Sequence, residues 1–335
     1  MTARRSLPRL ALGAALLVLG ASAAFAVRRT EDPLALVPAD ASTVALLRWS
    51  DLRSSPLGAQ VFAQMDGVST DGDGSRFLRD TGLNPREDID TMVLSMTKVA
   101  EGSDDEVLVV IQGRFDPSRI GSALVARQAV LQKGPNGSYY RLQADTTVHN
   151  RPGAVALVNP GLMLAGNESA VVAALARKES GGTGGLMAGQ GLGKQLSRVD
   201  PSASAWALMD LTRLPASVLN GSRHSAGSAD DASRAVVGAM KSVSLAVLQA
   251  KVHGDSVDVS AFGLTSDAEN RSLLQDSLRG VLAMWRLAIQ DKSPELVSVI
   301  RGFRIEDDGE GVSIKGTLPG SFLRSLSAQH QASAR

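Results

Sequence analysis

Two stretches of this chain combine an alternating strand pattern with a following helix start, and this combination limits the possible folds more than any other feature. Residues 106–115 and residues 255–264 alternate apolar side chains with other side chains. A period of two indicates a strand with one buried face. Apolar partner strands precede them at 92–96 and 242–252, so each pair predicts a β-hairpin and hence an antiparallel sheet.

A helix start follows each hairpin. Asp116 with Pro117 at the first helical position is an N-cap signature, and Ser266 with Glu269 forms a capping box. In the second helix, the apolar residues at three- and four-residue spacing that predict a packing face are Leu274, Leu278, Leu282, Trp285 and Ile289. We therefore expect an α+β fold, with helices on one face of an antiparallel sheet.

The same order of elements occurs twice, which predicts two similar modules. Strand candidates at 42–52 and 202–211 open the halves, and "YYRLQ" and "GFRIE" open later strands, the second turning at Asp308-Gly309. The first half adds "LMLAG" before a helix that we expect Asn167 to cap. Alternating strands and capped helices also recur in α+β proteins that contain no duplication.

The expected organisation has five parts. They are a signal peptide or N-terminal membrane anchor at 1–26, a first module at 33–179, a Gly-rich linker at 180–198, a second module at 199–328 and a tail at 329–335.

The first 26 residues resemble an export signal. Basic residues precede an apolar run that starts at Leu10, and the small residues Ala24 and Ala26 predict cleavage before Val27. If the segment stays uncleaved, residues 10–27 are the expected membrane contact. Both outcomes place the body outside the cytoplasm, periplasmic, secreted or anchored in the cytoplasmic membrane.

Composition excludes several functional classes. The chain has no cysteine, so disulfides, thiolate metal sites and cysteine nucleophiles are excluded. Without the three arginines that precede Ala26, 32 basic residues stand against 34 acidic ones. A near-neutral body of this kind lacks the basic surface of a nucleic-acid binder.

Three short motifs suggest phosphate binding, calcium binding or a serine nucleophile, but each departs from the pattern that such a site needs. "GQGLGK" at 189–194 lacks the first glycine and the Ser or Thr of a phosphate-binding loop, and "DGDGSR" at 71–76 lacks the glycine of a calcium loop. "SMTK" at 95–98 has the spacing of a serine nucleophile with its lysine, but lies in a strand pattern. The four histidines show no ligand spacing. We expect no cofactor, no metal and no catalytic residue.

With Pro38-Ala39-Asp40, "FLRDTGLNPREDIDTMVLS", "GRFDP" and "KGTLPGSFLRSL" in view, the chain resembles a loose group of uncharacterised exported bacterial proteins. In that group a similar module occurs once or twice behind a signal or anchor. The resemblance implies the architecture and supplies no site residue.

Three functions remain open from the sequence. The first is a non-catalytic envelope protein that binds or scaffolds another envelope component. The second is a hydrolase whose catalytic residues are dispersed along the chain. The third is a carrier of an apolar ligand such as a lipid, which requires an apolar cavity beside the sheet.

Overall fold

The computed structural model describes residues 32–58, 73–98, 105–143, 147–148, 151–213, 242–289 and 294–324. The fold given below is that of the compact unit that begins at Pro33.

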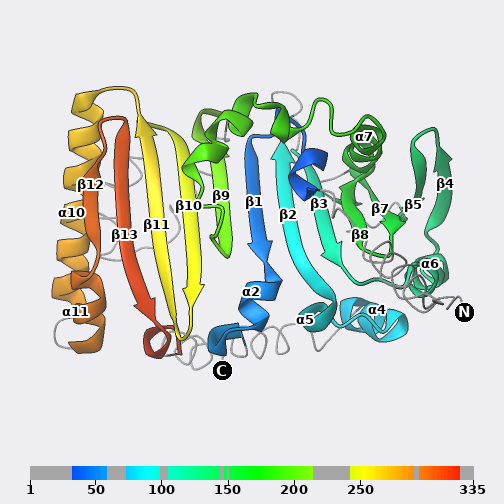
Figure 1. Ribbon diagram of the computed structural model, residues 1–335, viewed down its shortest axis with the longest axis horizontal. Helices are drawn as coiled ribbons and strands as arrows, with labels where there is room; N and C mark the ends of the chain where they lie inside the picture. Colours follow the sequence, from blue (N-terminus) through cyan, green and yellow to red (C-terminus); the bar gives the residue numbers. More distant parts are fainter. Residues whose placement is uncertain are drawn as a thin grey trace, which may run out of the picture. The chain divides into compact units, whose positions relative to one another are not determined.

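One antiparallel sheet of 13 strands forms this unit within the described residues (Figure 1). The strands are β1 (Thr43–Arg48), β2 (Ile89–Thr97), β3 (Glu106–Gly113), β4 (Val130–Gly134), β5 (Gly137–Arg141), β6 (Thr147–Val148), β7 (Arg151–Asn159), β8 (Leu162–Asn167), β9 (Ala205–Asp210), β10 (Val243–His253), β11 (Ser256–Thr265), β12 (Arg304–Asp307) and β13 (Gly311–Pro319). Their order is β12-β13-β11-β10-β9-β1-β2-β3-β8-β7-β5-β4, and β6 pairs with β7.

Helices of different lengths pack on this sheet. The α-helices are α2 (Trp49–Arg53), α4 (Asp73–Thr81), α5 (Pro85–Asp88), α6 (Pro117–Ala126), α7 (Glu168–Glu179), α10 (Ala268–Ile289) and α11 (Pro294–Arg301). The 3-10 helices are η1 (Pro33–Leu36), η2 (Leu186–Ala188), η3 (Gly191–Arg198) and η4 (Leu211–Arg213). The α+β class and the antiparallel sheet are confirmed.

The two halves of the chain meet at the pair β1 and β9, where Leu46 lies opposite Trp206. From this pair the sheet runs outward through β2 and β3 on one side and through β10 and β11 on the other. Both predicted hairpins form, since β2 pairs with β3 and β10 pairs with β11. The division into modules at 33–179 and 199–328 stays a prediction, and its junction falls inside one continuous sheet.

Helices cover both faces of the first half, whereas the sequence predicted one. Val110 of β3 lies in a core with Val171 of α7, which defines the α7 face. Its neighbour Ile111 lies in a second core with Ile120 and Leu124 of α6, which defines the α6 face. Both faces are covered because β3 is apolar at consecutive positions, as strands buried on both sides are.

Helix α10 packs on the second half. Leu274 lies in a core with Val243, Ala246 and Val312, and Leu278 packs against it. Trp285 belongs to the predicted packing face but is 57% exposed, whereas Leu282, one turn earlier, is 8% exposed.

The three predicted helices begin at or within one residue of their expected starts, but of the three expected caps only Asp116 makes side-chain cap hydrogen bonds. Asp116 accepts hydrogen bonds from the main-chain nitrogens of Ser118 and Arg119 at 3.0 and 3.1 Å. At α10 the cap is Asp267, which accepts from the nitrogen of Asn270 at 2.8 Å, and not Ser266. The side chain of Asn167 caps nothing, because its Oδ1 accepts from the nitrogen of Val107 at 2.6 Å and joins β8 to β3.

The Gly-rich stretch 180–198 packs against the sheet. Leu186 and Leu192, from η2 and η3, are 0% and 4% exposed and belong to the core of the α7 face. The Leu186 nitrogen also donates to the Val37 oxygen at 2.8 Å. The stretch that joins the two halves therefore contributes to the core of the first.

Candidate functional site

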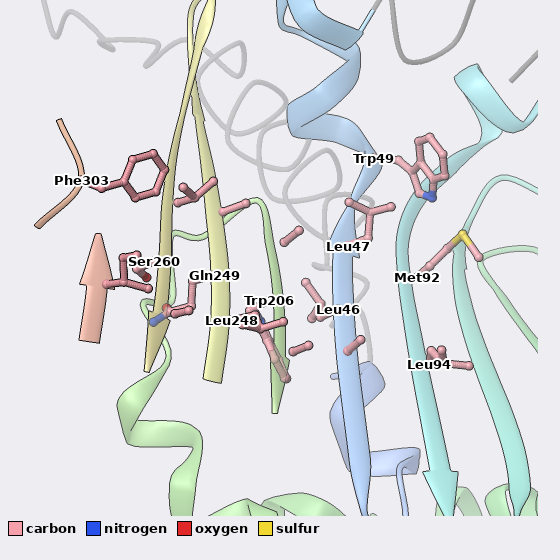
Figure 2. Close-up of a pocket in the computed structure, with 17 residues that line it drawn as sticks. Leu46, Leu47, Trp49, Met92, Leu94, Trp206, Leu248, Gln249, Ser260 and Phe303 are labelled. Carbon is pink, nitrogen blue, oxygen red and sulfur yellow. The ribbon is translucent and has the colours of Figure 1, made fainter. Parts of the chain in front are cut away.

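An apolar groove of about 670 Å³ lies on the α6 face, over the strands where the two halves of the chain meet (Figure 2). Its lining comes from β1, β2, β9, β10, β11 and β13, together with Trp49 of α2 and Phe303 just before β12. Helix α6 packs beyond β2 and helix α10 packs beyond β10, at the two ends of the sheet (Figure 1). The central strands between them form the floor of the groove.

The strand register arranges the lining in two rows that cross the sheet. In one row the residues directly opposite one another are Leu94, Ala45, Ala207, Leu248, Ala261 and Ile314. In the other row they are Met92, Leu47, Ala205, Ala250 and Val259. Cross-strand partners and residues two apart on one strand share a face, so all eleven side chains point to the same side of the sheet.

The groove is hollow because its middle is built from alanine. Ala45 and Ala207 occupy the centre of one row, and Ala205 and Ala250 lie between Leu47 and Val259 in the other. Longer side chains on β2 and on the strands beyond β9 form the walls. The five strand intervals from β2 to β13, at about 4.8 Å each, give a groove about 24 Å long.

The two polar residues in the lining, Gln249 and Ser260, contribute main chain only. The Gln249 amide lies on the α7 face, where its Oε1 accepts from the Asp200 nitrogen at 2.6 Å and its Nε2 donates to the Arg198 oxygen at 3.2 Å. Ser260 lies opposite Gln249 and shares that face. Among the residues that the structure describes, every side chain that faces the groove is therefore apolar, and none of them titrates or attacks as a nucleophile.

Aromatic residues stand at opposite ends of the groove, as Figure 2 shows for Trp49 and Phe303. Trp49 is 7% exposed and packs with the core under α6. Phe303 lies over Gly316 of β13, where a Cβ would stand 2.8 Å from the ring. Only glycine at 316 lets the ring lie this close to the sheet.

The walls expose large apolar surface to solvent. Leu94 is 38% exposed and Leu248 is 43% exposed. Contiguous exposed apolar surface of this kind commonly marks a binding site in a soluble domain.

The sequence motifs do not assemble into a catalytic centre in the described residues. Ser95 is 1% exposed inside β2, and its hydroxyl has no hydrogen-bond partner, so it cannot reach a substrate. His253 Nε2 lies 3.2 Å from Asp258 on the protein surface. His149, His224 and His330 lie outside the described residues. No group of three His, Cys, Asp or Glu side chains is arranged for a metal among the residues that the structure describes.

The predicted cleavage residues Ala24, Ala26 and Val27 lie outside the described residues, as does the whole apolar run 10–27. Of the helices in the described ranges, none has both the length and the apolar character to cross a bilayer. Cleavage and export stay predictions from the sequence.

The two loop motifs occupy ordinary helical positions. Residues 189–194 run into η3, and residues 73–76 of the calcium-like motif begin α4. Neither segment lines the groove.

Comparison with known proteins supports the fold. No protein-family model matches the chain, and no curated protein matches it. Among solved structures, crystal form III of TP0453 matches with a TM-score of 0.51 at 10% identity, over 89% of this chain and 98% of that chain. Crystal form I of TP0453 matches with a TM-score of 0.47 at 10% identity, over 90% of this chain and 99% of that chain. At this identity the likeness concerns the fold alone.

Proposed function

We propose that this protein is an exported carrier of an apolar ligand, and that the central groove binds an acyl chain of a lipid. The main support for this proposal is the uniform chemistry of the groove, because all of the described side chains that face it are aliphatic or aromatic. The export-like leader supports a location beside a membrane, where such ligands are abundant.

The size of the groove fits a single chain. The hydrocarbon core of a bilayer is about 30 Å thick, so an acyl chain that spans one leaflet is about 15 Å long. A groove about 24 Å long therefore accommodates one extended acyl chain. Each methylene group that leaves water contributes about 0.8 kcal/mol, so a chain of ordinary length gains affinity without any polar contact.

Other occupants fit the groove less well. An extended peptide cannot add a strand here, because β1 and β9 already have strand partners on both sides. A hydrolytic centre needs a nucleophile or a general base in the pocket, and the groove side chains supply neither.

The three tryptophans allow a direct test with a brominated fatty acid, which quenches an indole that it touches. One variant keeps Trp49 alone (Trp206→Phe with Trp285→Phe), and its matched control keeps Trp285 alone (Trp49→Phe with Trp206→Phe). Trp49 stands at the groove and is 7% exposed, whereas Trp285 on α10 is 57% exposed.

We expect saturable quenching of Trp49 and little quenching of Trp285. Random collisions with fatty acid in bulk solvent would instead quench Trp285 more than Trp49, because Trp285 is far more exposed. Equal quenching of both variants, or quenching of Trp285 alone, would contradict binding in the groove.

A further inference from the structure

A second cleft of about 580 Å³ lies over β10, β11, β13 and β12, and most of its lining residues are polar or charged. By strand alternation these side chains point to the α7 face, opposite the groove. Helix α7 packs over β3, β7 and β8 and does not reach this end of the sheet. The cleft and the groove are thus separate sites on opposite faces.

One cross-strand row in this cleft carries hydrogen-bond donors on three adjacent strands. Ser260 of β11 lies opposite Lys315 of β13, and Lys315 lies opposite Arg304 of β12. A hydroxyl, an ammonium and a guanidinium group therefore stand side by side, about 4.8 Å apart from strand to strand.

The charge of this row is only partly compensated. Like charges directly opposite each other on neighbouring strands destabilise a sheet, and Arg304 opposite Lys315 is such a pair. Lys315 Nζ lies 2.9 Å from Glu306 Oε2, and this hydrogen bond is the main cause that lowers the pKa of Glu306. Within the described residues the guanidinium of Arg304 has no hydrogen bond and no ion pair. The charges of two cations, Arg304 and Lys315, are thus balanced by one nearby carboxylate, that of Glu306.

The charges at the other end of the cleft are paired with one another. Lys251 Nζ lies 3.6 Å from Asp200, and His253 Nε2 lies 3.2 Å from Asp258. Asp258 also accepts a hydrogen bond from the Thr317 hydroxyl at 2.7 Å. The excess of positive charge and of donors is therefore confined to the β12 and β13 end.

We propose that Arg304, Lys315 and Ser260 form a binding site for an oxyanion of the phosphate class. A phosphate group presents several acceptor oxygens with two negative charges, which suits a planar guanidinium fork beside an ammonium group. The phosphate comes either from a free phosphate or from a lipid headgroup, and the two sources share the same contacts. This site is independent of the acyl-chain proposal, because it lies on the opposite face and uses none of the groove side chains.

Calorimetric titration of the full chain with inorganic phosphate at low salt tests the site. We expect Arg304→Gln and Lys315→Gln to weaken phosphate binding about tenfold or more, as removal of a charged hydrogen-bond partner does. Glu306→Gln should strengthen binding, because it removes the one carboxylate that competes for both cations. Arg301→Gln is the matched control, since Arg301 is an exposed arginine of α11 outside the cleft, and should leave affinity unchanged.

Cosedimentation with phosphatidylcholine vesicles, with and without phosphatidic acid, separates the two sources. Binding of free phosphate that Arg304→Gln abolishes supports a soluble ligand, and binding of phosphatidic acid vesicles that the same variant abolishes supports a headgroup. The site is refuted if neither probe binds, if Arg304→Gln and Arg301→Gln behave alike, or if Glu306→Gln weakens binding.

Discussion

Filling the groove from its floor should weaken ligand binding strongly without unfolding the protein. Ala207 lies at the centre of one row, between Ala45 and Leu248, and its side chain points into the groove. A phenylalanine at this position would place a ring across about one strand interval, roughly a fifth of the length of the groove.

The expected loss follows from the methylene groups that the ring displaces. A bound chain that can no longer bury about four methylene groups, at about 0.8 kcal/mol each, loses about 3 kcal/mol of binding free energy. This corresponds to an affinity roughly 100-fold weaker. The assay is titration with a fluorescent palmitate analogue, alongside thermal denaturation of each variant.

Val130→Phe is the matched control, because Val130 is a 56% exposed residue of the edge strand β4, outside the groove. We expect its affinity to equal that of the unaltered protein. If Ala207→Phe binds the probe as tightly as Val130→Phe and both remain folded, the groove is not the binding site and the reasoning from its alanine floor is wrong.

Three further predictions concern stability. Ser95→Ala should raise the free energy of unfolding in urea by about 1 kcal/mol, because the buried Ser95 hydroxyl lacks a partner; a loss of stability would show that the hydroxyl is bonded. Gly166→Ala should lower the free energy of unfolding in urea by about 3 kcal/mol, because φ of Gly166 is +147° and a Cβ would stand 2.1 Å from a β3 carbonyl oxygen. Gly254 has φ +55° and open space around its Cβ position, so Gly254→Ala should lower the free energy of unfolding clearly less. Burial raises the pKa of Glu168, but hydrogen bonds, foremost from Arg141, outweigh burial and hold that pKa below its usual 4.5. The stabilisation by Glu168 is therefore complete above about pH 4.5 and is lost as the pH falls through its lowered pKa, so Glu168→Gln should lower the melting temperature at pH 7 and lower it progressively less as the pH falls through that pKa; an equal loss at every pH would contradict this linkage.

Local features were predictable because they depend on neighbouring residues. The hairpin partners at 92–96 and 106–115 follow from alternation, and the Asp116 cap follows from the proline after it. The cap at Ser266 was wrong because two adjacent polar residues can compete for one helix end. Asn167 stands at the predicted N-cap position of α7, but its amide bonds to a strand 60 residues away in sequence instead of to the helix.

The groove was not predictable, because it depends on register between distant strands. Ala45, Ala207 and Ala250 are unremarkable in their own segments, and they become a floor only when β1, β9 and β10 pair side by side. Alternation alone indicated one buried face for each strand and did not show that part of that face stays open. Trp285 illustrates the converse limit, since its helical spacing predicted burial, whereas its side chain is 57% exposed.

Photo-crosslinking with a diazirine-bearing palmitate, followed by mass spectrometry of the modified peptides, shows directly whether the groove binds an acyl chain. We expect adducts on the strands that line the groove, at residues such as Met92, Leu94 and Leu248. Adducts concentrated on the exposed side chains of α10, such as Met284 and Leu287, with none on those strands, would contradict it.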